Sequence, residues 1–185
     1  MFQKICRFVL FRCLGWTYDI SLPERPKCIL CVAPHTSNWD FILGEVFYSA
    51  IGRKSGFMMK KNWFFWPLGS LLRRIGGIPV ERSRHTSLTD AVAEIARKSD
   101  TFHLAITPEG TRKKVDTWKR GFYVIALKAS IPIQLYALDY ANKKIVCTRE
   151  IDPNEALMEQ HMREIMDYYK PFRGRHPENF QIESF

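Results

Sequence analysis

The sequence predicts a single α/β domain, in which helices flank a central sheet that is mostly parallel or mixed. Its 185 residues suit one compact domain. Short β-rich runs alternate with helical patterns along the chain, as in sheets connected by helices. The hydrophobic content of 46% supports a sizeable core and excludes a disordered or low-complexity chain. The expected strands are 28–33, 56–59, 78–80, 102–107, 131–140 and 144–150, and the expected helices are 38–52, 62–74, 86–99, 119–130 and 153–169.

The first twenty residues predict an amphipathic helix. On a helical wheel over residues 2–16, Lys4, Arg7 and Arg12 share one sector and apolar residues fill the other. A basic helix with a tryptophan near its end is typical of a membrane interface. The same pattern also suits a helix that packs its apolar face on the core, and we give the two interpretations equal weight. Three cations interrupt the apolar run, so no membrane span is expected.

The net charge indicates what kind of partner the protein binds, and the cysteines indicate whether it has disulfides or a metal site. The net charge of +9 indicates an anionic partner: nucleic acid, an acidic membrane surface or a phosphorylated substrate. Nucleic acid is not expected, because the sequence carries no RNP-like, KH or helix-turn-helix signature. Five cysteines do not suggest a disulfide framework. Cys28 and Cys31 lie three apart on an expected strand, so they point to opposite faces, and we interpret them as core residues rather than metal ligands.

The strongest candidate site is the segment 33–40. His35 follows a buried strand, and ligand sites of α/β sheets gather beyond the carboxyl ends of strands. Asp40 falls in the first turn of the next helix, where its carboxylate can orient the imidazole of a general base. The spacing from Ser37 to Asp40 is also that of a helix capping box. His85 and Asp90 repeat the histidine–aspartate spacing after a charged loop, and we interpret that pair as capping only.

Three further segments carry cations near expected strand ends. Gly76–Arg82 and Thr107–Arg112 each place an arginine after a strand, and two arginines can bind a phosphate dianion. Gly110 allows close approach to the backbone. Lys60 and Lys61 precede an aromatic run, which suits a lipid–water interface, single-stranded nucleic acid or ordinary core packing.

Together these motifs resemble those of the glycerolipid acyltransferase family, which includes 1-acylglycerol-3-phosphate acyltransferases. His35–Asp40 matches the family's H-x-x-x-x-D motif, and Gly77–Arg82 matches its second motif. Glu109–Arg112 matches E-G-T-R, and Ser130–Ile133 matches the fourth motif. Order and spacing agree over residues 25–140. The segment beginning at Lys60 resembles the family's K-x-E-L stretch, with Asn62 in place of the acid.

The resemblance implies a reaction and a set of site residues. A fatty acyl chain would move from acyl-CoA or acyl carrier protein to the free hydroxyl of a lysophospholipid, with 1-acylglycerol-3-phosphate as the expected acceptor and phosphatidic acid as the product. His35 would take the hydroxyl proton and Asp40 would orient His35. No metal and no cofactor besides the acyl thioester are implied. The acceptor phosphate is expected at Arg82, Glu109, Gly110, Thr111 and Arg112, with Lys60 and Lys61 as further substrate or interface contacts.

The resemblance also implies an organisation and a location. Residues 1–20 would form a membrane-interface helix and residues 21–185 the acyltransferase domain, a peripheral or monotopic protein on the cytoplasmic face of a membrane. Two other functions stay open at this point. One is acylation of a lyso-aminolipid, such as a lyso-ornithine lipid. The other belongs to a different class, a non-catalytic protein that binds anionic lipid or nucleic acid.

Overall fold

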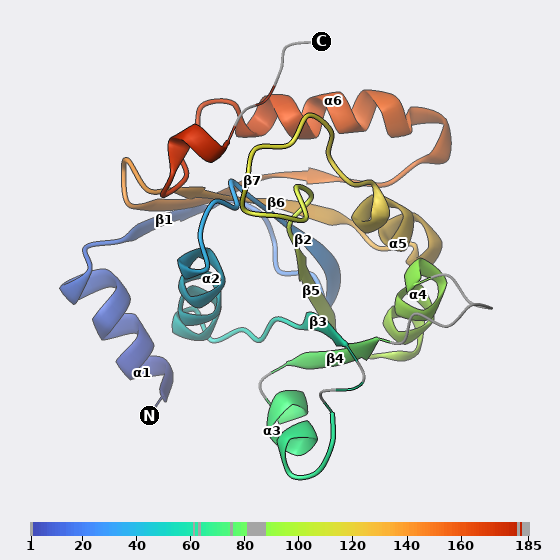
Figure 1. The fold of residues 1–185 in the computed structure, drawn as a ribbon, viewed down its shortest axis with the longest axis horizontal. Coiled ribbons are helices and arrows are strands. Elements are labelled where there is room, and N and C mark those ends of the chain that lie inside the picture. The colour runs from blue at the N-terminus through green and yellow to red at the C-terminus, as the bar shows by residue number, and fades with distance from the viewer. Residues whose placement is uncertain are drawn as a thin grey trace.

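The chain folds around a five-stranded mixed sheet with helices on both faces (Figure 1), which confirms the predicted α/β class. The computed structural model describes residues 2–60, 62, 64–74, 76–80, 88–180 and 182. The strand order across the sheet is β1 (Thr17–Ile20), β7 (Lys144–Ile151), β6 (Ile133–Asp139), β2 (Lys27–Ala33) and β5 (Phe102–Ile106).

Three neighbouring strands of this sheet, β6, β2 and β5, run parallel to one another. Their carboxyl ends therefore meet at one edge of the sheet. Strand β7 runs antiparallel to β6 and parallel to β1. A second sheet pairs β3 (Phe57–Lys60) with β4 (Gly77–Val80). It joins the edge of β5 through Gly56, whose N–H donates to the carbonyl of His103 at 2.6 Å and whose carbonyl accepts from the N–H of Ala105 at 3.0 Å.

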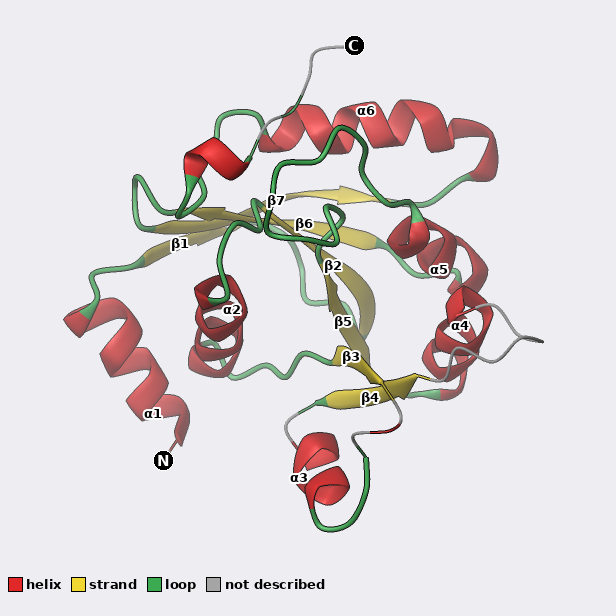
Figure 2. Cartoon of the chain, viewed as in Figure 1, coloured by secondary structure: helices red, strands yellow, loops and turns green. Residues whose placement is uncertain are grey.

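The central strand β2 separates two hydrophobic layers. Its residues alternate between them: Ile29 and Cys31 pack with one layer, and Cys28 and Leu30 with the other. This placement confirms that the two cysteines are core residues on opposite faces. Figure 2 shows the helices that cover the two faces. The first layer receives α4 (Leu88–Lys98), α5 (Gly121–Ala129) and α6 (Met158–Tyr169), and the second receives α1 (Phe2–Arg7) and α2 (Trp39–Ala50).

The N-terminal helix buries part of its apolar face in the core and leaves the rest exposed. α1 continues as a π-helical segment, Phe8–Cys13, and the N–H of Leu14 donates to the carbonyl of Val9, five residues earlier. Cys6 and Leu10 are buried in the layer that contains α2. Phe11 packs partly against this layer, whereas Phe2, Ile5, Phe8, Val9 and Leu14 are exposed. Within the described residues, no helix has the length and apolar character needed to cross a bilayer.

Two elements differ from the sequence prediction. Strand β1 was not expected. Its four residues do alternate between polar and apolar, but so short a run directly after the helical pattern of residues 2–16 is a weak strand signal. The helix expected over 62–74 is shorter, since α3 covers only Leu68–Arg74. Proline disfavours a helical conformation in the residue before it, so Pro67 accounts for the late start. The aromatic side chains of Phe65 and Trp66 precede the helix and are exposed.

Candidate active site

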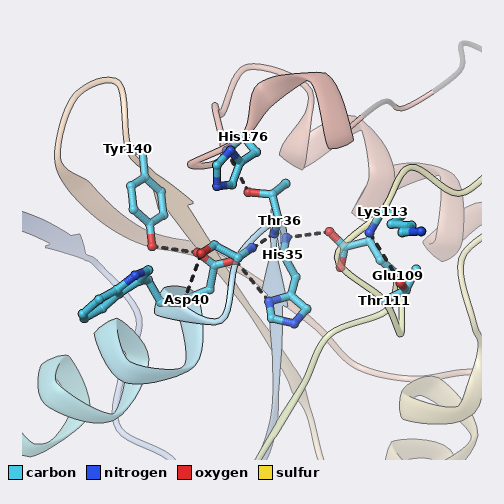
Figure 3. A network of polar contacts seen from close by, with 10 residues as sticks. His35, Thr36, Asp40, Glu109, Thr111, Lys113, Tyr140 and His176 are labelled. Atoms are coloured by element: carbon cyan, nitrogen blue, oxygen red, sulfur yellow. Dashed lines mark hydrogen bonds and ion pairs between the residues drawn. The ribbon is translucent and has the colours of Figure 1, made fainter.

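Three loops meet where the parallel strands β5, β2 and β6 end. The loop after β2 carries His35, the loop after β5 carries Glu109, and Tyr140 directly follows β6. Figure 3 shows these side chains together with Asp40. Since the carboxyl ends of parallel neighbours lie at one edge of a sheet, the topology alone brings residues 35, 109 and 140 together.

Asp40 is the centre of this network. It lies in the first turn of α2 and is only 3% exposed. One carboxylate oxygen, Oδ2, lies 3.1 Å from Nδ1 of His35 and accepts the N–H groups of Thr36 and Ser37 at 2.7 and 2.8 Å. The other, Oδ1, accepts the hydroxyl of Tyr140 at 2.7 Å. The contact with Ser37 is the one that a capping box predicts, so Asp40 both caps the helix and pairs with His35.

These contacts fix the charge of Asp40 and the role of each imidazole nitrogen of His35. Burial by itself would raise the pKa of Asp40, but the hydrogen bonds from His35, Tyr140 and the two backbone N–H groups hold that pKa below its ordinary value. An ionised carboxylate can only accept hydrogen bonds, so Nδ1 of His35 carries the proton. Nε2 then keeps its lone pair and can act as a base.

Glu109 supports His35 from the neighbouring strand. Its carboxylate is 5% exposed, and Oε1 accepts the backbone N–H of His35 at 2.8 Å. Oε2 is buried and has no hydrogen-bond partner among the described residues. Burial raises the pKa of Glu109 to about 7, although the N–H of His35 acts in the opposite direction. The first residue of the E-G-T-R motif therefore positions the backbone beside the imidazole.

A cavity of about 460 Å³ lies beside His35 and Asp40, within the size range of small-molecule sites. Most of the side chains that line it are apolar, and they come from α2, α5 and strands of both sheets. Phe41, Gly44 and Tyr48 form the stripe of α2 that faces it. A Cβ atom added to Gly44 would meet nothing within 4 Å, so the space beside this residue is open.

The other residues singled out in the sequence occupy different positions. Gly110 lines the cavity in a left-handed conformation with φ of +65°. Thr111 Oγ1 accepts the N–H of Lys113 at 3.4 Å. Arg112 is exposed and is not among the residues that line the cavity. The backbone of Lys60 ends β3, while Lys61, Arg82 and His85 lie outside the described residues.

Sequence reasoning missed Tyr140 and the segment that follows α6. The carbonyl of Arg173 accepts the N–H of Tyr140 at 2.8 Å, and the N–H of His176 donates to Oγ1 of Thr36 at 3.1 Å. Between them Gly174 packs so closely that a Cβ atom there would lie 2.7 Å from Oγ1 of Thr36. Residues 173–176 thus pack against the loop after β2 and help to fix its position. Tyr140 ended a run correctly predicted as a strand, but the strand order that makes it a neighbour of Asp40 is not readable from sequence.

Comparison with known proteins agrees with this geometry. The family model described as Acyltransferase matches residues 21–137, a span that contains His35, Asp40 and the E-G-T-R loop. The chain belongs to the acyltransferase family.

A solved structure extends the likeness to the fold of this acyltransferase. The crystal structure of the 1-acyl-sn-glycerophosphate (LPA) acyltransferase PlsC from Thermotoga maritima superposes with a TM-score of 0.57 at 17% sequence identity. The match covers 88% of this chain and 76% of that one. At this identity the likeness concerns the fold. Comparison with curated proteins gives no significant sequence match.

Replacing Tyr140 with phenylalanine tests whether its hydroxyl holds the carboxylate of Asp40. Tyr140→Phe removes the donor to Oδ1 of Asp40 and keeps the ring, which packs edge-on against Trp16 at 5.1 Å. A hydrogen bond to a charged group contributes about 1.5 kcal/mol or more, so we expect kcat in an acyl-transfer assay to fall roughly tenfold while KM stays nearly constant. Tyr168→Phe, which removes a hydroxyl bonded to Thr148 instead, is the control. Equal kcat values in the two variants would contradict the role.

Replacing Glu109 with glutamine tests the buried carboxylate through the pH dependence of stability. Since the pKa of Glu109 is raised from 4.5 to about 7, folding is favoured by its protonated form. That contribution is complete below pH 4.5 and is lost as the pH rises through 7, a loss of up to roughly 3 kcal/mol. Glu109→Gln keeps the acceptor for His35 and cannot ionise.

We therefore expect denaturant unfolding of the Glu109→Gln variant to show a smaller loss of stability than the wild type between about pH 5 and about pH 8. Glu155→Gln changes an exposed glutamate and serves as the control. A wild-type pH dependence that Glu109→Gln leaves unchanged would refute a raised pKa for this group.

Proposed function

We propose that this acyltransferase moves a fatty acyl chain from an acyl thioester to the free hydroxyl of a lysophospholipid, with 1-acylglycerol-3-phosphate as the acceptor. The observation that carries the proposal is a histidine–aspartate pair, 3.1 Å apart, at the wall of an apolar cavity. A hydroxyl needs a base to attack a thioester, and a fatty chain needs an apolar site. The donor is acyl-CoA or acyl carrier protein.

The chemistry follows from the two nitrogens of His35. Nε2 accepts the proton of the acceptor hydroxyl while its oxygen attacks the thioester carbonyl carbon. The imidazolium that forms is stabilised by Asp40, whose carboxylate lies against Nδ1. Collapse of the tetrahedral intermediate breaks the carbon–sulfur bond, and the thiolate leaves with the proton from His35. The products are the new ester and a free thiol, so atoms and charges balance without an acyl-enzyme or a redox step.

The residues around the cavity suggest where the acyl chain and the acceptor phosphate would lie. The acyl chain would lie in the cavity along the stripe of α2 that contains Gly44. The acceptor phosphate would lie at the E-G-T-R loop, where Arg112 is exposed. Arg82 keeps its expected role at the acceptor phosphate, and Lys60 and Lys61 keep theirs as further contacts with the substrate or the lipid interface.

We also propose that the protein works at the cytoplasmic face of a membrane. Large apolar side chains are exposed on α1 and on α2, two helices that pack against each other. On α2 they are Trp39, Phe41 and Ile42, next to Asp40. Exposed aromatic residues beside cations are typical of a lipid interface. Arg175 has its guanidinium 5.3 Å from the ring of Trp39, which adds a cation beside this apolar surface.

A transfer assay tests the proposed reaction. The purified protein is incubated with labelled acyl-CoA or acyl carrier protein and a panel of acceptors: 1-acylglycerol-3-phosphate, other lysophospholipids and lyso-ornithine lipid. We expect diacyl product with 1-acylglycerol-3-phosphate. His35→Ala should lower turnover at least about a hundredfold. His161→Ala, which alters a histidine bonded to Tyr123, should change it little.

Three other results of this assay would change the proposal in different ways. Product formed only with lyso-ornithine lipid would replace the acceptor and keep the mechanism. A His35→Ala variant as active as the wild type would refute the base. Binding to anionic lipid with no transfer to any acceptor would indicate a non-catalytic lipid-binding protein.

Enlarging Gly44 tests where the acyl chain lies. Leucine favours helix more than glycine does, and the space at this position is open, so Gly44→Leu should fold while filling part of the cavity. We expect the ratio of kcat/KM for long-chain over short-chain acyl-CoA to fall at least about tenfold, with Gly44→Ala intermediate. An unchanged chain-length preference would place the acyl chain elsewhere.

Vesicle co-sedimentation tests the membrane interface. Basic residues near an anionic surface contribute roughly 1 kcal/mol each, so the wild type should sediment with anionic vesicles and be released only partly by salt. The triple change Phe2→Gln, Ile5→Gln and Phe8→Gln should reduce binding. Ile95→Gln with Leu157→Gln, which alters exposed apolar residues elsewhere, should not. Wild-type protein that stays in the supernatant at low salt would refute the interface.

A further inference from the structure

Lys119 lies at the catalytic cavity, although no sequence motif pointed to it. It comes two residues before α5, and its backbone N–H donates to the carbonyl of Pro108 at 2.8 Å. This bond ties the residue to the loop that contains Glu109 and Gly110. Lys119 also lines the cavity that His35 and Asp40 line, and among the described lining residues it is the one lysine or arginine.

The side chain of Lys119 is held over Gly110. A Cβ atom added to Gly110 would lie 2.7 Å from Nζ, 2.8 Å from Cε and 2.9 Å from Cδ of Lys119. A glycine at this position thus leaves room for the lysine stem, in addition to allowing the positive φ. From sequence we expected Gly110 to admit the substrate to the backbone. Its closest side-chain neighbour is a cation of the same chain.

The charge of Lys119 is not neutralised within the described part of the protein. No carboxylate there forms an ion pair with its ammonium group. Asp40 accepts four hydrogen bonds, and Glu109 accepts the N–H of His35 through Oε1, while its Oε2 has no hydrogen-bond partner among the described residues. Lys119 is an exposed residue, so its ammonium group is open to solvent beside a largely apolar cavity and can attract an anion to it.

We propose that Lys119 binds a phosphate group of a substrate at this cavity. The inference rests on the proposed acyl transfer and adds a contact to it. Two substrates can supply the phosphate: the phosphomonoester of the acceptor, or the phosphates of the coenzyme A or pantetheine part of the donor. Arg112 lies on the same loop but outside the cavity lining, so the two cations can be tested separately.

Steady-state kinetics with 1-acylglycerol-3-phosphate and palmitoyl-CoA test this contact. Lys119→Met keeps the length of the stem and removes the charge, while Lys119→Arg keeps the charge. Lys114→Met changes an exposed lysine of the same loop that does not line the cavity. A charged hydrogen bond corresponds to roughly tenfold to a hundredfold in affinity. We expect Lys119→Met to raise KM for one substrate roughly tenfold to a hundredfold while kcat stays nearly unchanged. In Lys119→Arg, KM for that substrate should stay close to the wild-type value.

The substrate whose KM rises identifies the source of the phosphate. If Lys119→Met raises KM for 1-acylglycerol-3-phosphate but not for a monoacylglycerol, which has no phosphate, Lys119 binds the phosphate of the acceptor. If Lys119→Met raises KM for palmitoyl-CoA instead, Lys119 binds a phosphate of the donor. Unchanged KM values for both substrates, an equal effect of Lys114→Met, or a loss confined to kcat would overturn the proposal.

A binding measurement separates this proposal from the proposed function. If the wild type transfers no acyl group, isothermal titration of palmitoyl-CoA and of 1-acylglycerol-3-phosphate in detergent micelles still measures the contact. Binding to the wild type that weakens tenfold or more in Lys119→Met supports a phosphate site. Equal binding to both proteins, or no binding to the wild type, overturns it.

Discussion

The carboxylate of Asp40 accepts four hydrogen bonds, and the geometry of the loop that carries His35 depends on them. A buried carboxylate is costly unless donors surround it. Here His35 and the N–H groups of Thr36 and Ser37 approach one oxygen, and the hydroxyl of Tyr140 approaches the other. The donors that stabilise the charge also fix the backbone of the loop and orient the imidazole. The carboxylate that binds backbone N–H groups at the start of α2 is therefore the same one that orients the imidazole of His35.

The sheet explains why these groups meet. Residues 35, 109 and 140 follow three neighbouring parallel strands, so small changes in strand packing would move all three together. Helix α2 has a complementary role. It begins at the loop that carries His35, includes Asp40, forms one wall of the cavity through Gly44 and exposes Trp39 beside the site. In the proposed function, one helix thus connects the base, the acyl chain and the lipid surface.

Local patterns made His35 and Asp40 visible in the sequence, because they lie just after a strand and within one turn of a helix start. Glu109 was visible only through the E-G-T-R motif, and its contact with the backbone of His35 was not expected. Contacts that depend on strand order were not visible. Tyr140 reaches Asp40 only because β6 neighbours β2, and Lys119 lies over Gly110 only through loop packing. Strand β1 was missed because it is only four residues long and directly follows the helical pattern of the N-terminus. The burial of Cys28 and Cys31 on opposite faces followed directly from strand period.

The tautomer of His35 is the most direct test of this account. If the ionised Asp40 orients the ring, the neutral imidazole carries its proton on Nδ1 and leaves Nε2 free. Nitrogen-15 NMR of the labelled protein distinguishes the two forms by the shifts of the two ring nitrogens. We expect the Nδ1–H tautomer to dominate in the wild type and to lose that dominance in Asp40→Asn. A wild-type His35 found mainly as the Nε2–H tautomer would contradict the assignment of His35 as the base.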